Sequence, residues 1–165
     1  MSALMEIEKK LDKEVISFLK ELETGNSNAK GKKSLNFEGL LSDTMLKIFA
    51  IRQGIPFHLF YLITLYSPYS ENDWISFLDI SKKSLQRYKQ ESRRFGHLQS
   101  EKIIEMAEVT KVGLEVFGDM DKFKLWLSTP NFALGSMKPI ELIRDSYGKD
   151  LVVGELTRIN YGIFA

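Results

Sequence analysis

The sequence predicts an all-α protein of 165 residues. Apolar residues recur at helical spacing in most of the chain, for example between residues 37 and 53, and residues suited to helix ends stand at the borders of these runs. The one β-like run, LVVGEL at 151–156, is flanked by Asp150 and Arg158, which fit a helix better. No convincing alternating strand is found elsewhere, so we expect helices throughout.

Composition excludes several classes of protein. An apolar fraction of 44 % is enough for a real core and argues against global disorder. The net charge of +1 by itself indicates neither nucleic acid nor membrane, and the absence of cysteine excludes disulfides and thiolate zinc sites. The longest apolar stretch, IPFHLFYLITLY, contains Pro56 and His58 and is too short to span a bilayer. We therefore expect a soluble, cytoplasmic protein without a signal peptide.

Residues 1–24 predict an amphipathic N-terminal helix. Leu4, Leu11 and Phe18 repeat every seven residues. This spacing fits either a short coiled-coil seam that joins two chains or a helix that lies on its own domain, and the sequence favours neither. Residues 25–35 are polar and glycine-bearing and predict a flexible linker.

The following elements are predicted in order from their caps. One helix covers about residues 37–53 and ends at Gly54, and a second runs from Pro56 to about Tyr66. Ser70 with Asp73 is close to a capping box that opens a short helix, and Ser81 caps the next. A long helix is expected from about Ser100 to Phe117. Several short helices follow, each opened by a proline or closed by a glycine: Pro130, Gly135, Pro139, Gly148 and Gly162.

The segment SENDWISFLDISKKSLQRYKQESRR, residues 70–94, has the pattern of a helix-turn-helix. Its first helix is expected to bury Trp74, Phe77 and Leu78, and its second Ile80 and Leu85. Between residues 81 and 94 six Lys or Arg residues and one Glu give a local charge of +5. The candidate DNA-binding residues are Lys82, Lys83, Gln86, Arg87, Lys89, Arg93 and Arg94. Gln86 suits an adenine edge and Arg87 a guanine edge, whereas the alternative is a solvated basic helix without a ligand.

The last fifty residues hold several motifs in a fixed order. They are FGD at 117–119, WL at 126–127, PNFALG at 130–135, KPIELI at 138–143, Gly148 and the ending RINYGIFA. With the preceding helix-turn-helix and LQSEK at 98–102, they resemble the Xre/MbcA/ParS antitoxin family over about residues 40–165. Gly135-Ser136 replaces the two adjacent glycines frequent in the family, and LQRYKQ lacks its usual double arginine, which leaves DNA specificity open.

The resemblance implies a domain organisation and a function. Residues 36–110 would form an Xre-like helix-turn-helix domain and residues 111–165 a toxin-binding domain. The partner would be a RES-domain toxin that consumes NAD. The antitoxin would obstruct the active site of this toxin and repress its own promoter, as a homodimer within a larger toxin–antitoxin complex. The alternatives are a stand-alone helix-turn-helix repressor and a helical adaptor that binds only protein.

The C-terminal end supplies the candidate toxin-binding residues. They are Asn131, Arg158, Tyr161, Gly162, Ile163, Phe164 and Ala165. Large apolar side chains near a terminus are costly to expose, and aromatic side chains are typical interface anchors. Gly162 can end the last helix, so that the following residues leave its axis. Trp126 is expected in the core instead.

No residues are predicted to carry catalysis. The two histidines, His58 and His97, lie in different elements and lack a metal-ligand companion at helical spacing. Asp119 is better explained as a helix cap than as a metal ligand, and Glu141 with Arg158 is expected to form a structural or interfacial pair. We therefore expect no enzyme, no cofactor and no metal.

Overall fold

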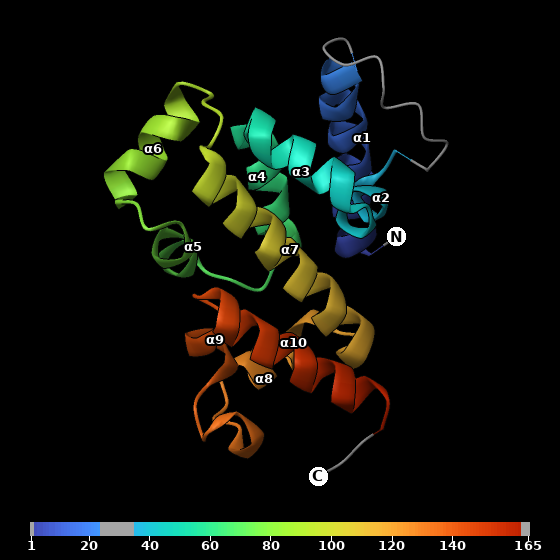
Figure 1. Ribbon diagram of the computed structural model, residues 1–165, viewed down its shortest axis with the longest axis vertical. Coiled ribbons are helices and arrows are strands. Elements are labelled where there is room, and N and C mark those ends of the chain that lie inside the picture. The colour runs from blue at the N-terminus through green and yellow to red at the C-terminus, as the bar shows by residue number, and fades with distance from the viewer. Residues whose placement is uncertain (1, 24–34, 163–165) are drawn as a thin grey trace. The chain divides into compact units, whose positions relative to one another are not determined.

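The computed structural model describes residues 2–23 and 35–162, and these ranges are helical (Figure 1). The elements are α1 (Ala3–Glu23), α2 (Phe37–Ser42), α3 (Thr44–Gln53), α4 (Phe57–Tyr66), α5 (Glu71–Leu78), α6 (Lys82–Gln90), α7 (His97–Phe117), α8 (Met120–Leu127), the 3-10 helix η1 (Phe132–Leu134), α9 (Pro139–Leu142) and α10 (Ser146–Asn160). Apart from two isolated bridges, the described ranges contain no strand. The prediction of an all-α fold is confirmed.

The chain forms two compact units. Unit 1 comprises Met1–Tyr66 and Leu78–Ile104, and unit 2 comprises Ser67–Phe77 and Glu105–Ala165. The domain limits expected from the sequence stay a prediction, and the expected linker lies outside the described residues except for Leu35. None of the helices in the described ranges is both long and apolar enough to cross a membrane.

In unit 1 the N-terminal helix α1 packs against α4, α2 and α3. Leu11, Val15 and Phe18 are buried, and the Asp12 carboxylate accepts a hydrogen bond of 3.0 Å from the backbone N–H of Phe37, at the start of α2. The side chains with seven-residue spacing therefore pack largely against other helices of the same chain. Of the two alternatives left open by the sequence, the structure has the helix that lies on its own domain.

The single helix predicted over residues 37–53 is wrong, because Asp43 divides it into α2 and α3. The Asp43 carboxylate accepts hydrogen bonds from the backbone N–H groups of Met45 and Leu46, at 3.0 and 3.2 Å. Asp43 itself has an extended backbone, with φ −108° and ψ 110°. A short carboxylate that bonds the nearby backbone replaces the helical ladder by a cap, and hydrophobic spacing alone does not reveal this.

Most predicted caps are confirmed. Ser70 and Asp73 bond each other reciprocally, at 2.9 and 3.1 Å, and the Ser81 hydroxyl accepts from the N–H of Ser84 at 3.0 Å. The long helix begins at His97 rather than near Ser100. Ser100 is buried, and its hydroxyl accepts a hydrogen bond of 2.9 Å from the Ile55 N–H, so it ties unit 1 together instead of capping a helix.

In unit 2 Gly148 does not close a helix, as the sequence predicted, but lies in the first turn of α10. Its N–H donates to the Asp145 carboxylate at 2.7 Å. A Cβ atom at this position would stand 1.8 Å from the carbonyl oxygen of Leu142, at the end of α9. Glycine is therefore required because α9 and α10 approach too closely for any side chain.

Replacing Leu11 with alanine is expected to lower the free energy of unfolding by about 2–5 kcal/mol, because the side chain is fully buried in unit 1. Denaturant unfolding measures the change. Met5→Ala on the exposed side of α1 is the matched control and should shift stability by less than about 0.5 kcal/mol. A loss that depends on protein concentration would contradict packing within one chain and indicate a seam between two chains.

Replacing Gly148 with alanine is expected to destabilise the protein by about 1–3 kcal/mol, because the new methyl group forces α10 away from Leu142. Thermal unfolding measures the effect. Gly154→Ala in the same helix is the control, since a Cβ there meets nothing within 4 Å. An unchanged melting temperature for Gly148→Ala would show that the approach of α9 and α10 relaxes without cost.

Candidate functional site

The basic helix α6 leaves the predicted polar residues exposed. Lys82, Lys83, Gln86, Arg87 and Lys89 all lie at the surface. Tyr88 holds the helix on unit 1, because its ring stacks on Phe95 with centroids 4.5 Å apart and planes 10° from parallel. Ile80 and Leu85, which were predicted to be buried, are only half-buried.

The two arginines after α6 have partners within unit 1. The Nε of Arg93 lies 2.5 Å from a carboxylate oxygen of Glu91. The guanidinium of Arg94 lies 2.6 Å from Glu21 on α1 and 5.7 Å from the centre of the Phe18 ring. Two of the six cations predicted to bind DNA are therefore used, at least in part, to neutralise acidic side chains of the chain itself.

The turn before α6 contains one residue with a left-handed backbone. Asp79 adopts a left-handed conformation, with φ 52°, which Asp tolerates better than most residues. Leu78 and α6 belong to unit 1, whereas Ser67–Phe77 belongs to unit 2. The docking geometry expected of a helix-turn-helix stays a prediction.

Unit 2 carries a second candidate surface, made of large apolar side chains that are exposed. Of the eleven such residues in the described ranges, six lie between residues 125 and 161: Leu125, Phe132, Met137, Tyr147, Leu151 and Tyr161. A concentration of this kind, in a stretch of fewer than forty residues, is typical of a surface that binds a partner.

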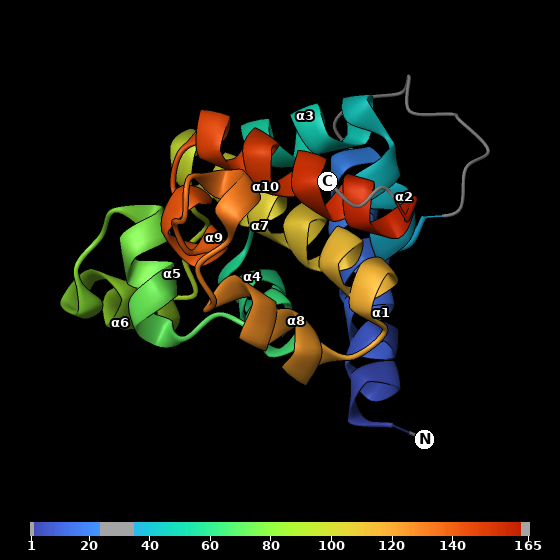
Figure 2. The same cartoon turned by 90° about the horizontal axis from the view of Figure 1, so that it is seen from below.

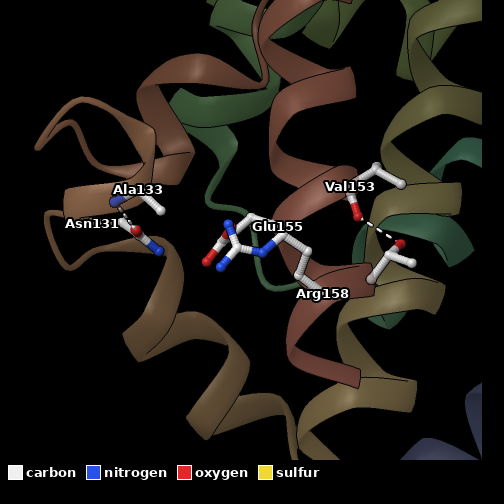
Figure 3. Close-up of polar contacts among 6 residues, drawn as sticks. Asn131, Ala133, Val153, Glu155 and Arg158 are labelled. Atoms are coloured by element: carbon white, nitrogen blue, oxygen red, sulfur yellow. Dashed lines mark hydrogen bonds and ion pairs between the residues drawn. The ribbon is translucent and has the colours of Figure 1, made fainter. Parts of the chain in front are cut away.

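Asn131 shapes the loop that presents Phe132. Its side-chain oxygen accepts a hydrogen bond of 2.9 Å from the Ala133 N–H, the contact drawn in Figure 3, and its own N–H donates to the carbonyl of Met137 at 3.0 Å. Gly135 and Ser136 close the loop with left-handed backbones. The loop thus holds Phe132 outward with 94 % of its surface exposed, and Pro130 precedes this cap rather than opening a helix.

Arg158 lies on α10 beside the same loop. Figure 3 shows the side chains of Glu155 and Arg158 extending from α10 toward Asn131, and α10 contacts η1. The Arg158 guanidinium lies 3.4 Å from the Glu155 carboxylate. The predicted pair of Arg158 with Glu141 is wrong, because Glu141 instead accepts a bond of 3.4 Å from the Lys138 N–H at the start of α9. Asn131, as the N-cap of η1, and Arg158 on α10 thus belong to two elements of unit 2 that contact each other.

The last helix, α10, ends close to Gly162, as the sequence predicted. Tyr161 follows the helix and is 75 % exposed, and Gly162 has a left-handed backbone with φ 69°. Ile163, Phe164 and Ala165 lie outside the described residues. Trp126, predicted as core, is only half-buried, with its ring 5.8 Å from that of Phe117, whereas its neighbour Leu127 is buried.

Sequence reasoning missed Phe132, Tyr147 and Leu151. Phe132 stands in a helix of three residues, which is too short for a period to show which side faces solvent. Tyr147 and Leu151 are separated by one turn of α10, whose other side buries Val152 and Leu156. A helical projection of residues 146–160 shows two apolar sides. The side with Tyr147 and Leu151 was the signal in the sequence that α10 has a second apolar side.

The expected role of Asp119 is confirmed, since its carboxylate caps α8 through the Lys122 N–H at 3.0 Å. Within the described ranges no group of three or more His, Asp or Glu side chains is placed to hold a metal ion. The candidates that remain are the exposed basic residues of α6 in unit 1 and the six exposed apolar residues of unit 2.

The comparison with known protein families concerns the same segment of unit 2. Residues 113–162 match the family described as the antitoxin Xre/MbcA/ParS C-terminal toxin-binding domain. A solved structure, the crystal structure of the M. tuberculosis MbcT–MbcA toxin–antitoxin complex, contains a chain with 26 % identity; the match covers 56 % of this chain and 82 % of that chain, with a TM-score of 0.47. The search of curated proteins found no match.

The family match extends from the second half of α7 to Gly162, so it includes all six exposed apolar residues of unit 2. It is a match to a domain that binds protein, which agrees with the expectation that the chain is not an enzyme. Residues 113–162 are therefore similar to the C-terminal toxin-binding domain of the Xre/MbcA/ParS antitoxin family.

Proposed function

We propose that this protein is the antitoxin of a toxin–antitoxin pair and binds its toxin through unit 2. The observation that carries the proposal is a coincidence of position. The segment that matches a toxin-binding domain is also the segment that exposes Phe132, Tyr147 and Tyr161. Aromatic side chains dominate the energetics of protein interfaces, because they bury a large area with few rotatable bonds.

The toxin that we propose is a RES-domain protein that degrades NAD, on the strength of the motifs shared with the family. The chain end from Tyr161 to Ala165 would obstruct its active site. Two features support this arrangement: Tyr161 is exposed, and Gly162 has a left-handed backbone with φ 69°, a conformation that commonly ends a helix. Asn131 and Arg158 would contact the toxin with an amide and a guanidinium beside this end.

Removing residues 162–165 is expected to leave folding and DNA binding intact and to weaken inhibition of the toxin. Burying the Phe164 side chain in a partner is worth about 1.5–3 kcal/mol, so inhibition should weaken about ten- to a hundredfold. The measurement is NAD consumption by the product of the adjacent gene, titrated with the full-length and the shortened protein.

Tyr61→Ala is the control for the shortened protein, since Tyr61 is an exposed aromatic residue on α4 of unit 1. It should inhibit as the wild type does. Equal inhibition by the shortened protein, at an unchanged melting temperature, would show that the end is not the obstruction and would place the contact around Asn131 and Arg158.

We propose in addition that α6 binds promoter DNA, so that the antitoxin represses its own operon as a homodimer. The exposed cations of α6 support this function, because phosphate contacts by Lys and Arg supply most of the affinity for DNA. Gln86 and Arg87 also stand at the surface, as residues that read base edges must. A dimer would bring two such helices to two half-sites.

Replacing Lys82, Lys83 and Arg87 with alanine is expected to abolish promoter binding and to leave toxin inhibition unchanged. Each lost phosphate contact should reduce the slope of log affinity against log salt by about one. Fluorescence anisotropy with the upstream DNA, at several salt concentrations, measures both quantities.

The matched control replaces Lys10, Lys13 and Lys20 with alanine, which removes the same charge from exposed positions of α1. Normal promoter binding is expected. If the α6 variant binds the promoter normally, α6 is not the reader. If the wild type fails to bind DNA even at low salt, the chain acts on protein alone.

A further inference from the structure

One side of α10 carries a stripe of residues that are exposed, except for Arg158, which is half-buried. Tyr147, Leu151, Gly154, Arg158 and Tyr161 form this stripe, which we name the α10 stripe. On a helix with about 100° per residue these positions fall within about 80° of one another, and they extend over about 21 Å. Tyr147 is 87 % and Leu151 58 % exposed, whereas Val152 and Leu156 on the opposite side are fully buried. Figure 2 shows α10 as one continuous helix.

Gly154 at the centre of the stripe has no explanation inside the chain. Glycine destabilises a helix interior relative to alanine, so its presence requires a reason. Its backbone is not left-handed, because the glycines of the described ranges with positive φ are Gly54, Gly118, Gly135 and Gly162. A Cβ atom at Gly154 would meet nothing within 4 Å. Gly148, in the same helix, is the opposite case, because there the chain itself leaves no room.

We propose that the α10 stripe is a docking site for an apolar helix of the toxin, whose backbone crosses α10 at Gly154. Without a side chain at the crossing point, two backbones approach closely, which is a recurrent use of glycine. Tyr147 and Tyr161 then act as anchors at the two ends, and Leu151 fills the turn before the crossing. Arg158, whose guanidinium lies 3.4 Å from Glu155, stands one turn after it, where its remaining N–H groups can donate to an oxygen of the toxin.

The toxin is favoured as the occupant because all five residues of the stripe lie between residues 113 and 162, the segment that matches a toxin-binding domain. The whole of α10 lies inside the segment that matches a toxin-binding domain. Within the stripe Arg158 also lies 3.4 Å from the Glu155 carboxylate, and Figure 3 shows both side chains. The inference thus rests on the proposed function and adds the point and manner of contact.

The test uses the full chain with Gly154→Ala and Gly154→Leu. Alanine should raise the melting temperature by about 1–4 °C, because it favours the helix, and yet weaken toxin affinity about tenfold, since its methyl group separates the two backbones. Leucine should weaken affinity about a hundredfold. Opposite effects on stability and affinity exclude misfolding as the cause. The probe is the purified product of the adjacent gene, with affinity measured by calorimetry and molar mass by light scattering.

Ser146→Leu is the matched control, because it adds a leucine at an exposed position of the same helix, about 100° from the middle of the stripe. Its affinity should equal that of the wild type. If both Gly154 variants bind as the wild type does, the crossing at Gly154 is overturned while the proposed function stands. If they change only the molar mass of the chain alone, the stripe joins two copies and the inference is likewise overturned. If the wild type neither binds nor inhibits the gene product, both the inference and the proposed function fail.

Discussion

The arrangement of unit 2 depends on the close contact of α10 with the end of α9. At Gly148 the helix comes so near to the carbonyl of Leu142 that a side chain has no room. The contact fixes the first turn of α10, with Asp145 as its cap, and burial of Val152 and Leu156 fixes the rest. Since the position and rotation of α10 are set in this way, the opposite side of the helix is committed to solvent or to a partner.

The candidate toxin-binding surface separates residues that give shape from residues that give contact area. Asn131 directs its amide to the backbone of its own loop, and Glu155 partly neutralises Arg158. In the same segment the rings of Phe132, Tyr147 and Tyr161 are exposed. A surface that is already ordered before binding loses less conformational entropy when the partner arrives, so more of the contact energy appears as affinity.

In unit 1 some basic side chains are paired with acidic residues of the chain, and others are exposed. The net charge of +1 conceals a segment of +5 at residues 81–94, but Arg93 and Arg94 lie against Glu91 and Glu21. The contact of Arg94 with Glu21 also links the segment after α6 to α1. The cations of α6 itself point into solvent, where they are available for phosphate groups without first breaking a salt bridge of this kind.

The sequence by itself determined the elements whose signals are local. Caps such as Ser70 with Asp73, Ser81 and Asp119 bond backbone groups only a few residues away, and Gly162 ends a helix through its own φ angle, so these features can be read from short patterns. The ordered motifs of the last fifty residues likewise indicated the family that residues 113–162 match, because their spacing is a property of the chain.

Only the tertiary structure decided which faces are covered. The spacing of Leu11 and Phe18 is the same whether α1 packs on α4 or on a second chain, and the sequence does not distinguish the two. Gly148 and Gly154 are the same residue type in the same helix, but a Cβ atom would clash with the end of α9 at Gly148 and would meet nothing within 4 Å at Gly154. Exposure is a relation between elements that are distant along the chain, and for that reason local pattern does not contain it.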